Sequence, residues 1–227
     1  SCAACRPPRA VVAASQERDF WMHGLQARAM RWQEKLNPSA VCLRSPGALL
    51  SDDPVQLSNF PTRLVDVGHK IEFAKRAGAS ISVNHDAETL SVNASAFGSP
   101  LLTRDEFDVP IRTTYLLAAA QLLRTGIARI PYPGGCPIGG GASGARGYDL
   151  HVMVWEKLGA AVSELPDHIE VSAPNGLRGN TINFPITTVG GTENALLCAS
   201  VASGQTQIFN AYITPEVHDL IALLRRM

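Results

Sequence analysis

Apolar residues recur along residues 39–227 with two different spacings, and their alternation predicts an α/β fold. Within residues 112–124 the apolar positions at i, i+1, i+4 and i+7 form a stripe along one face of a helix: Leu116, Leu117, Ala120 and Leu123. Gly126 follows, where a left-handed residue commonly ends a helix. Residues 205–209 instead alternate in part between polar and apolar, which is typical of a strand covered on one side.

The same order of predicted elements occurs three times, which predicts a repeat architecture. The first copy has helices over 39–50 and 65–77 and strands over 55–59, 79–83 and 89–92. The second has helices over 112–124 and 148–158 and strands over 127–131, 160–164 and 168–172. The third has helices over 193–202 and 215–227 and a strand over 205–210. Because this copy lacks its closing strands, we expect the third repeat to be truncated.

Residues 1–32 lack this pattern. They show no strand pattern, and a helix over 18–33 would not keep its apolar positions at a 3.6-residue spacing. We treat residues 1–32 as a leader that is either poorly ordered or an artefact of the gene model. Residues 33–227 then form one domain.

The composition excludes several classes of protein. The chain has 227 residues, 20 Lys+Arg against 20 Asp+Glu, and 45% hydrophobic residues. It therefore lacks the high net charge of disordered chains and the positive charge of nucleic-acid-binding proteins. Its longest apolar run, residues 115–123, contains Gln121 and is far shorter than the roughly 20 residues that cross a bilayer. We expect a globular protein whose partners include neither nucleic acid nor membrane.

The five cysteines, an odd number with irregular spacing, do not resemble a disulfide framework. This favours a reducing compartment, and we expect the protein in the cytoplasm. Cys2 and Cys5 form a C-x-x-C pair, but no second pair completes the four ligands of a structural zinc site. We expect neither a metal nor a cofactor.

A glycine-rich loop over residues 133–146 carries Cys136. Glycine lets the backbone approach a ligand closely, and the nearby Arg146 and His151 could favour a thiolate or assist proton transfer. A flexible linker with an incidental thiol explains the same residues, because most cysteines are buried and inert. The residue pattern alone leaves both interpretations open.

The same loop matches the dinucleotide fingerprint at Gly139, Gly141 and Gly144. In that fingerprint the first glycine follows the strand directly, whereas Gly139 lies seven positions after Tyr132. The acidic partner expected farther along would be Glu164, which the repeat places on a strand. A dinucleotide-binding oxidoreductase is therefore the weaker alternative, and NAD(H) binding would test it.

Residues 133–139, followed by 144–151, resemble the catalytic loop of the UDP-N-acetylglucosamine enolpyruvyl transferase family, with a short insertion of small residues. Further segments carry the resemblance in the same order: residues 53–61, 109–112, 158–160, 188–194 and 210–216. Together they cover residues 35–227. The resemblance implies an inside-out α/β barrel built of three βαβαββ units, which agrees with the repeat.

The resemblance also implies an activity. The family transfers enolpyruvate from phosphoenolpyruvate to a hydroxyl of a uridine-nucleotide sugar, the first committed step of peptidoglycan precursor synthesis. By resemblance Cys136 donates the proton to phosphoenolpyruvate and is the thiol that fosfomycin alkylates, with Arg146 and His151 as further catalytic residues. The implied substrate-binding residues are Lys35, Asn37, Arg112, Gly147, Tyr148, Asp149, Leu150, Ile186, Thr187, Thr188, Val189 and Gly190.

Two departures from the family keep other functions open. Ile186 stands where the family has a lysine, which favours a transferase that acts on a simpler uridine nucleotide in nucleoside-antibiotic synthesis, or a non-catalytic nucleotide-binding module. In addition, the family has a second, similar domain that closes over the first, and nothing in this sequence corresponds to it. We therefore expect this chain to be the catalytic-loop half of a transferase, inactive alone.

Overall fold

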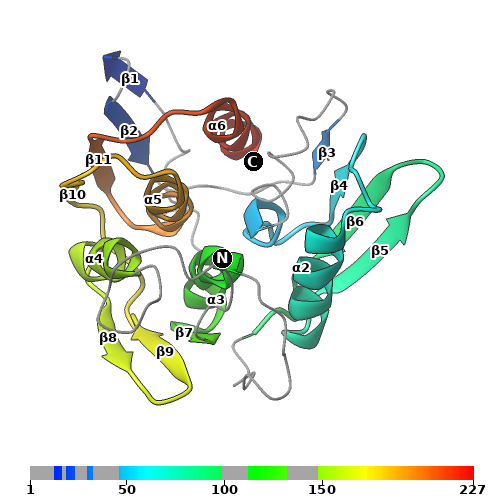
Figure 1. The fold of residues 1–227 in the computed structure, drawn as a ribbon, viewed down its shortest axis with the longest axis horizontal. Helices are drawn as coiled ribbons and strands as arrows, with labels where there is room; N and C mark the ends of the chain where they lie inside the picture. Colours follow the sequence, from blue (N-terminus) through cyan, green and yellow to red (C-terminus); the bar gives the residue numbers. More distant parts are fainter. Residues whose placement is uncertain (1–12, 17–18, 24–29, 33–45, 99–111, 132–147) are drawn as a thin grey trace, which may run out of the picture.

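The computed structural model describes residues 13–16, 19–23, 30–32, 46–98, 112–131 and 148–227. Its strands form three sheets around a group of helices (Figure 1). The first sheet has the order β1 (Ala13–Gln16), β2 (Asp19–His23), β11 (Gln205–Phe209) and β10 (Thr181–Asn183). The second has the order β3 (Met30–Trp32), β4 (Val55–Leu57), β6 (Thr89–Asn93) and β5 (Ser80–Asn84). The third has the order β7 (Ile127–Pro131), β9 (His168–Ser172) and β8 (Ala161–Glu164).

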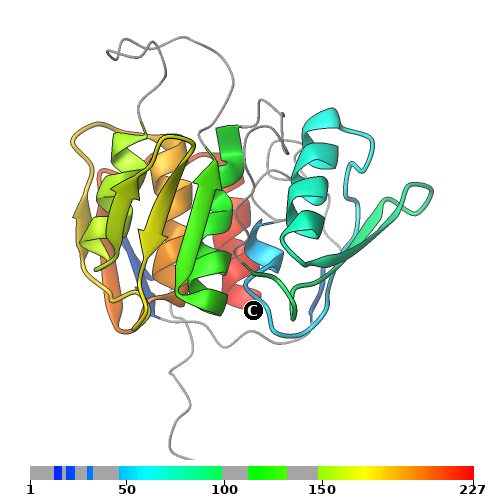
Figure 2. The same cartoon turned by 90° about the horizontal axis from the view of Figure 1, so that it is seen from below.

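Helices lie between and beside these sheets, in addition to a short helical segment at residues 46–48. They are α2 (Val65–Arg76), the 3-10 helix η2 (Arg112–Leu117), α3 (Ala118–Thr125), α4 (Asp149–Lys157), α5 (Val189–Val201) and α6 (Pro215–Arg226). Figures 1 and 2 show α3, α5 and α6 in the middle, with the sheets around them. Helix α5 is buried from Gly191 to Ser200 and packs against α3, α4 and α6. Because ten consecutive residues of α5 are buried, this helix lies in the interior, and the helices around it form the centre of this domain.

Two segments of the chain share one topology. In the first, β4, α2, β5 and β6 follow one another, and β6 pairs antiparallel with both β4 and β5. In the second, β7, α4, β8 and β9 follow one another, and β9 pairs antiparallel with both β7 and β8. The last segment differs. Its strands β10 and β11, which precede and follow α5 in the sequence, pair in parallel with each other, and β1 and β2 complete their sheet. The alternation of helices and strands is confirmed, whereas the count of three equivalent repeats is not.

The expectation that residues 1–32 contain no strand was wrong. Strand β2 pairs antiparallel with β11, with Met22 opposite Thr206, and β3 pairs in parallel with β4, with Arg31 opposite Gln56. The physical reason is that β4 and β11 would otherwise be edge strands, whose backbone groups can pair with almost any extended segment whatever its side-chain pattern. The division of the chain at residues 32 and 33 remains a prediction.

Arg124, in the last turn of α3, links this helix to the turn that precedes β4. Its guanidinium forms an ion pair with Asp52 and donates a hydrogen bond of 2.6 Å to the carbonyl oxygen of Ser51. Asp52 is largely exposed, whereas the arginine side chain is mostly buried. The contact therefore joins the turn before the first segment of shared topology to the helix that precedes the second.

Candidate active site

Three helices meet at one end of the domain. Strand β8 runs parallel to β7, since both are antiparallel to β9, so the intervening helix α4 starts at the carboxyl end of β7. Helix α5 likewise starts at the carboxyl end of β10, because it connects two parallel strands. Strand β7 returns alongside α3, which places η2 near the carboxyl end of β7 as well (Figure 2). In α/β proteins, ligands bind preferentially at the carboxyl ends of strands.

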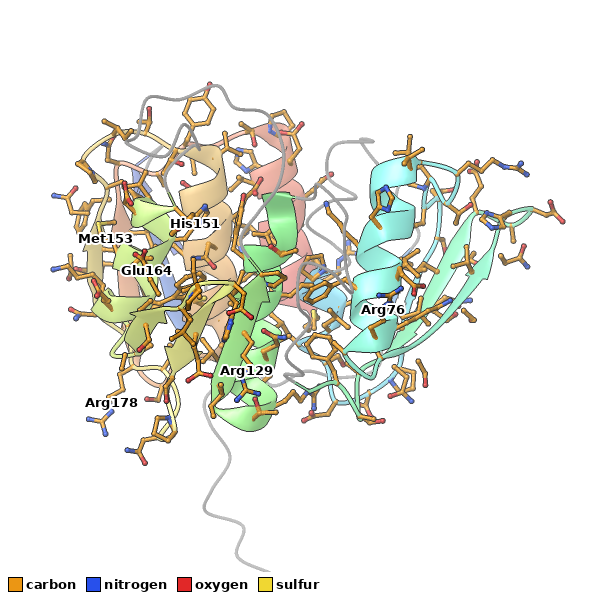
Figure 3. All side chains as sticks on the ribbon, turned by 60° about the horizontal axis from the view of Figure 1, so that its bottom comes forward. Arg76, Arg129, His151, Met153, Glu164 and Arg178 are labelled. Atoms are coloured by element: carbon orange, nitrogen blue, oxygen red, sulfur yellow. The ribbon has the colours of Figure 1, made fainter. Side chains whose placement is uncertain are left out.

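The three helices contact one another through Tyr115 on η2, His151 on α4 and Gly190 on α5. The ring of Tyr115 stacks on the imidazole of His151, with the centroids 3.7 Å apart and the planes at 29°. A Cβ atom on Gly190 would lie 2.7 Å from the Tyr115 hydroxyl and 3.4 Å from Cε1 of His151. Figure 3 shows His151 on α4 beside α5. A glycine at position 190 is therefore what lets the two rings lie against the first turn of α5.

The first turn of α5 has a defined cap. The Thr188 hydroxyl accepts a hydrogen bond of 3.2 Å from the backbone N–H of Gly191, and the Thr192 hydroxyl donates one of 2.7 Å to the Thr188 carbonyl. This helix begins at Val189, four residues before the predicted start at position 193. Two consecutive glycines lower helix propensity and hid the start of the helix in the sequence. Backbone N–H groups and the helix dipole make such an end favourable for an anion.

The predicted residues 148–151 form the start of α4. Tyr148 is its N-cap residue, and its carbonyl accepts hydrogen bonds from the N–H groups of His151 and Val152. Asp149 is exposed, Tyr148 and Leu150 are partly buried, and His151 is buried. Helical geometry thus turns the imidazole inward to Tyr115 and leaves the carboxylate in solvent.

The predicted residues 186–190 span the end of the connection from β10 and the first two residues of α5. Ile186 is 64% exposed and Val189 is 37% exposed, so this connection presents apolar side chains to solvent. Tyr212, which follows β11, is 47% exposed and donates its backbone N–H to the Thr192 hydroxyl at 3.0 Å. Parallel pairing brings the ends of β10 and β11 together, with Asn183 opposite Phe209. Sequence reasoning missed Tyr212 and Tyr115, although Tyr115 lies one helical turn after the predicted site residue Arg112.

Several predicted site residues fall outside the described part of the chain: Lys35, Asn37, Cys136, Arg146, Gly147 and the side chain of Arg112. The backbone of Arg112 begins η2, at the end of the domain where His151 and Gly190 lie. The loop that carries Cys136 follows β7 and precedes α4, so both of its attachment points are at this end. The structure therefore brings together His151, Tyr148, Asp149 and residues 188–190 and does not test the contact of Cys136 with them.

Two buried titratable groups lie on α5. Burial raises the pKa of Glu193 to about 7; Lys70 on α2 opposes this shift and Glu216 on α6 adds to it. Burial also raises the pKa of the Cys198 thiol to about 12, and the thiol donates a hydrogen bond of 3.5 Å to Oδ1 of Asn194. Cys198 is thus a poor nucleophile, because the thiolate is the reactive form. Within the described residues, no three His, Cys, Asp or Glu side chains are grouped so that they could hold a metal ion.

Comparisons with known proteins identify the family of this chain. The model of the EPSP synthase (3-phosphoshikimate 1-carboxyvinyltransferase) family matches residues 47–227. The chain belongs to this family. It is 36% identical over 184 residues to the UDP-N-acetylglucosamine 1-carboxyvinyltransferase of Dinoroseobacter shibae and 37% identical over 185 residues to that of Paracoccus denitrificans. These matches cover 80% of this chain but 42% and 41% of the two relatives, respectively.

Solved structures of the same family share the fold. The enolpyruvyl transferase NikO from Streptomyces tendae matches with a TM-score of 0.69 and 23% identity, over 92% of this chain and 47% of that one. An EPSP synthase from Acinetobacter baumannii matches with a TM-score of 0.56 and 16% identity, over 83% of this chain and 44% of that one. The resemblance to enolpyruvyl transferases that the loop motif suggested is thereby confirmed, and the chain spans less than half the length of these relatives. In the part of the chain that the structure describes, no helix is long and apolar enough to span a membrane.

Proposed function

We propose that this chain is the catalytic-loop half of an enolpyruvyl transferase that uses phosphoenolpyruvate and UDP-N-acetylglucosamine. One observation supports the proposal above all. His151, Thr188 and Gly190 lie together at the end of the domain where the loop that carries Cys136 joins β7 and α4. Family membership supports it, because the curated relatives are named UDP-N-acetylglucosamine 1-carboxyvinyltransferases. Because the matches cover 42% and 41% of these relatives, we assign the full reaction to a protein of their whole length and propose no turnover by the residues of this chain alone.

The proposed reaction is an addition followed by an elimination. The sugar hydroxyl attacks C2 of phosphoenolpyruvate and loses its proton to a base, while Cys136 delivers a proton to the methylene carbon. This forms a tetrahedral ketal. Loss of a proton from the new methyl group and departure of phosphate then regenerate the double bond on the sugar ether. We assign Cys136 as the proton donor, because it is the thiol in the loop whose ends are fixed beside α4.

Cationic groups would bind the phosphate and carboxylate of phosphoenolpyruvate. We assign this role to Arg112, Arg146 and His151, which begin η2, end the loop and lie in the first turn of α4, respectively. Preorganised charges of this kind stabilise the anionic transition state because they need no reorganisation during the reaction. The first turn of α5 adds backbone N–H groups on the same side.

We assign the uridine nucleotide to the surface that joins α4 and α5. The residues proposed to contact it are Tyr148, Asp149, Leu150, Ile186, Thr187, Thr188, Val189 and Gly190, together with Lys35, Asn37 and Gly147, which lie outside the described part of the chain. The exposure of Asp149, Ile186 and Thr187 is compatible with ligand binding, because these side chains are accessible without rearrangement. In the cell we place this reaction in the cytoplasm, in peptidoglycan precursor synthesis, with fosfomycin as the inhibitor expected to alkylate Cys136.

A second candidate acceptor is a simpler uridine nucleotide. The observation that favours it is Ile186, which is 64% exposed and cannot contact a phosphate as the lysine of the family would. The fold likeness to NikO is compatible with either acceptor. We also propose that the segment from β10 to α6 belongs to a third βαβαββ unit.

Alkylation by fosfomycin tests the proposal without requiring turnover. The full chain is treated with fosfomycin in the presence of UDP-N-acetylglucosamine, uridine monophosphate or no nucleotide, and adducts are located by mass spectrometry. We expect an adduct on Cys136 that UDP-N-acetylglucosamine promotes, and no adduct on the buried Cys198, which serves as the internal control. Equal promotion by uridine monophosphate favours the simpler acceptor. Nucleotide binding without an adduct indicates a non-catalytic module, and the absence of both contradicts the proposal.

A further inference from the structure

Tyr115 is a residue of the candidate site to which neither the loop motif nor the family relationship assigns a role. It is 8% exposed, and it lies on η2 one helical turn after Arg112. Its ring covers one face of the His151 imidazole at 3.7 Å. Trp155, one turn along α4, approaches the same imidazole with centroids 6.4 Å apart and planes at 35°. The imidazole of His151 therefore has aromatic rings from two helices beside it, and the ring of Tyr115 is the one stacked on it.

This stacking has an electrostatic consequence. His151 is 7% exposed, and burial disfavours the charged form of a histidine because the imidazolium loses its hydration. The face of a tyrosine ring carries negative partial charge and attracts a cation placed over it. At 3.7 Å the Tyr115 face is close enough to replace part of the lost hydration. The contact thus favours the imidazolium, the form of histidine that binds an anion.

The position of the Tyr115 ring is set by α5. Its hydroxyl oxygen lies 2.7 Å, and its Cζ atom 3.5 Å, from the place where a Cβ of Gly190 would be. The hydroxyl thus occupies the space that a side chain at position 190 would fill. Because Cε1 of His151 lies 3.4 Å from the same point, the two rings and the first turn of α5 form one packed group.

We propose that Tyr115 is the positioning residue for His151: its ring holds the imidazole in its charged form against the first turn of α5, where an anionic group of the substrate binds. The identity of that anion, the phosphate or carboxylate of phosphoenolpyruvate, rests on the function proposed above. The orientation of the imidazole follows from the stacking geometry and does not depend on that function.

The test compares Tyr115→Phe, which keeps the aromatic face, with Tyr115→Leu, which removes it. The imidazole resonances of His151 are followed by NMR against pH in the full chain and assigned with a His151→Asn variant. We expect the midpoint of the His151 titration to move to lower pH in Y115L and to stay close to that of the wild type in Y115F. We expect binding of phosphoenolpyruvate near neutral pH to weaken about two- to five-fold in Y115L, from the usual strength of a cation–π contact.

Phe73→Leu is the matched control. Phe73 is a buried aromatic residue on α2, and its loss reduces core packing without touching the stacked pair. We expect F73L to leave the His151 titration unchanged. If Y115L does not fold, Tyr115→Met replaces it, and the ring-current shift of the His151 Cε1 proton in the wild type reports the stacking directly.

The outcomes separate this inference from the proposed function. An unchanged titration midpoint in folded Y115L, or no ring-current shift in the wild type, overturns the role of Tyr115. A shift in Y115F as large as that in Y115L overturns it as well, because the hydroxyl and not the ring face would then control the imidazole. If the midpoint moves as expected but the wild type does not bind phosphoenolpyruvate, the positioning of His151 stands and the proposed substrate is wrong.

Discussion

Replacing Glu193 with glutamine tests whether a buried carboxyl group on α5 makes the stability of this domain depend on pH. Glu193 is 8% exposed, and its pKa is raised from 4.5 to about 7, chiefly by burial. Its folded-state pKa therefore lies above the unfolded value, and the folded state binds the proton more tightly. The resulting stabilisation is complete below about pH 4.5 and is lost as the pH rises through about 7.

The magnitude follows from the size of the shift. At about 1.4 kcal/mol for each pKa unit, the difference corresponds to about 3 kcal/mol of unfolding free energy, most of it lost between about pH 5 and about pH 8.5. Glutamine has the shape of the protonated side chain and does not titrate. We therefore expect the wild type to lose about 2–3 kcal/mol more than E193Q over that range.

The assay is urea unfolding at the two pH values, followed by tryptophan fluorescence, because Trp155 is fully buried. Glu156→Gln, at an exposed position on α4, controls for the removal of any carboxylate, and its pH dependence should equal that of the wild type. The interpretation fails if E193Q and the wild type lose the same free energy between the two pH values. It also fails if the wild type gains stability with rising pH relative to E193Q.

Three further substitutions probe packing and hydrogen bonds in the described residues. Gly190→Ala should destabilise the domain by about 1–3 kcal/mol, because its Cβ would lie 2.7 Å from the Tyr115 hydroxyl, and Y115F should remove most of that cost. Arg124→Ala should cost about 1.5–3 kcal/mol through the lost hydrogen bond to Ser51, whereas Asp52→Ala should cost under about 1 kcal/mol because that carboxylate is exposed. Gln121→Leu should stabilise the domain by about 1–2 kcal/mol, since both polar atoms of this buried amide have no hydrogen-bond partner among the described residues.

All three are measured as changes in the free energy of urea unfolding. Additive effects of G190A and Y115F would show that the hydroxyl does not occupy the space beside α5. Equal costs for R124A and D52A would assign the contact to the ion pair instead of the backbone hydrogen bond. A loss of stability in Q121L would show that the amide has a partner in solution, such as a buried water molecule.

The sequence alone predicted the strands correctly where the local pattern of apolar residues agrees with their burial in the fold. Strands β7 and β9 were predicted with the bounds that the structure has, because apolar residues and the glycine that ends α3 mark them clearly. The structure overrode the sequence at β10, which has three residues with a single buried side chain, and at the strands before residue 33. These strands exist because a neighbouring edge offers backbone partners, and pairing of that kind leaves little trace in the side chains.

The candidate site also has features that the sequence predicted and features that only the structure shows. The motif over residues 144–151 and the segment 188–194 carry the family resemblance, so His151, Thr188 and Gly190 could be named from the sequence. The stacking of Tyr115 on His151 and the raised pKa of Glu193 could not, since both depend on helices that are distant in sequence and packed together in the fold. Sequence determined which chemical groups this protein carries and the helices and strands on which most of them lie. Tertiary structure alone decided which groups lose their water and which rings touch, because burial and contact arise only when α4, α5 and η2 pack against one another.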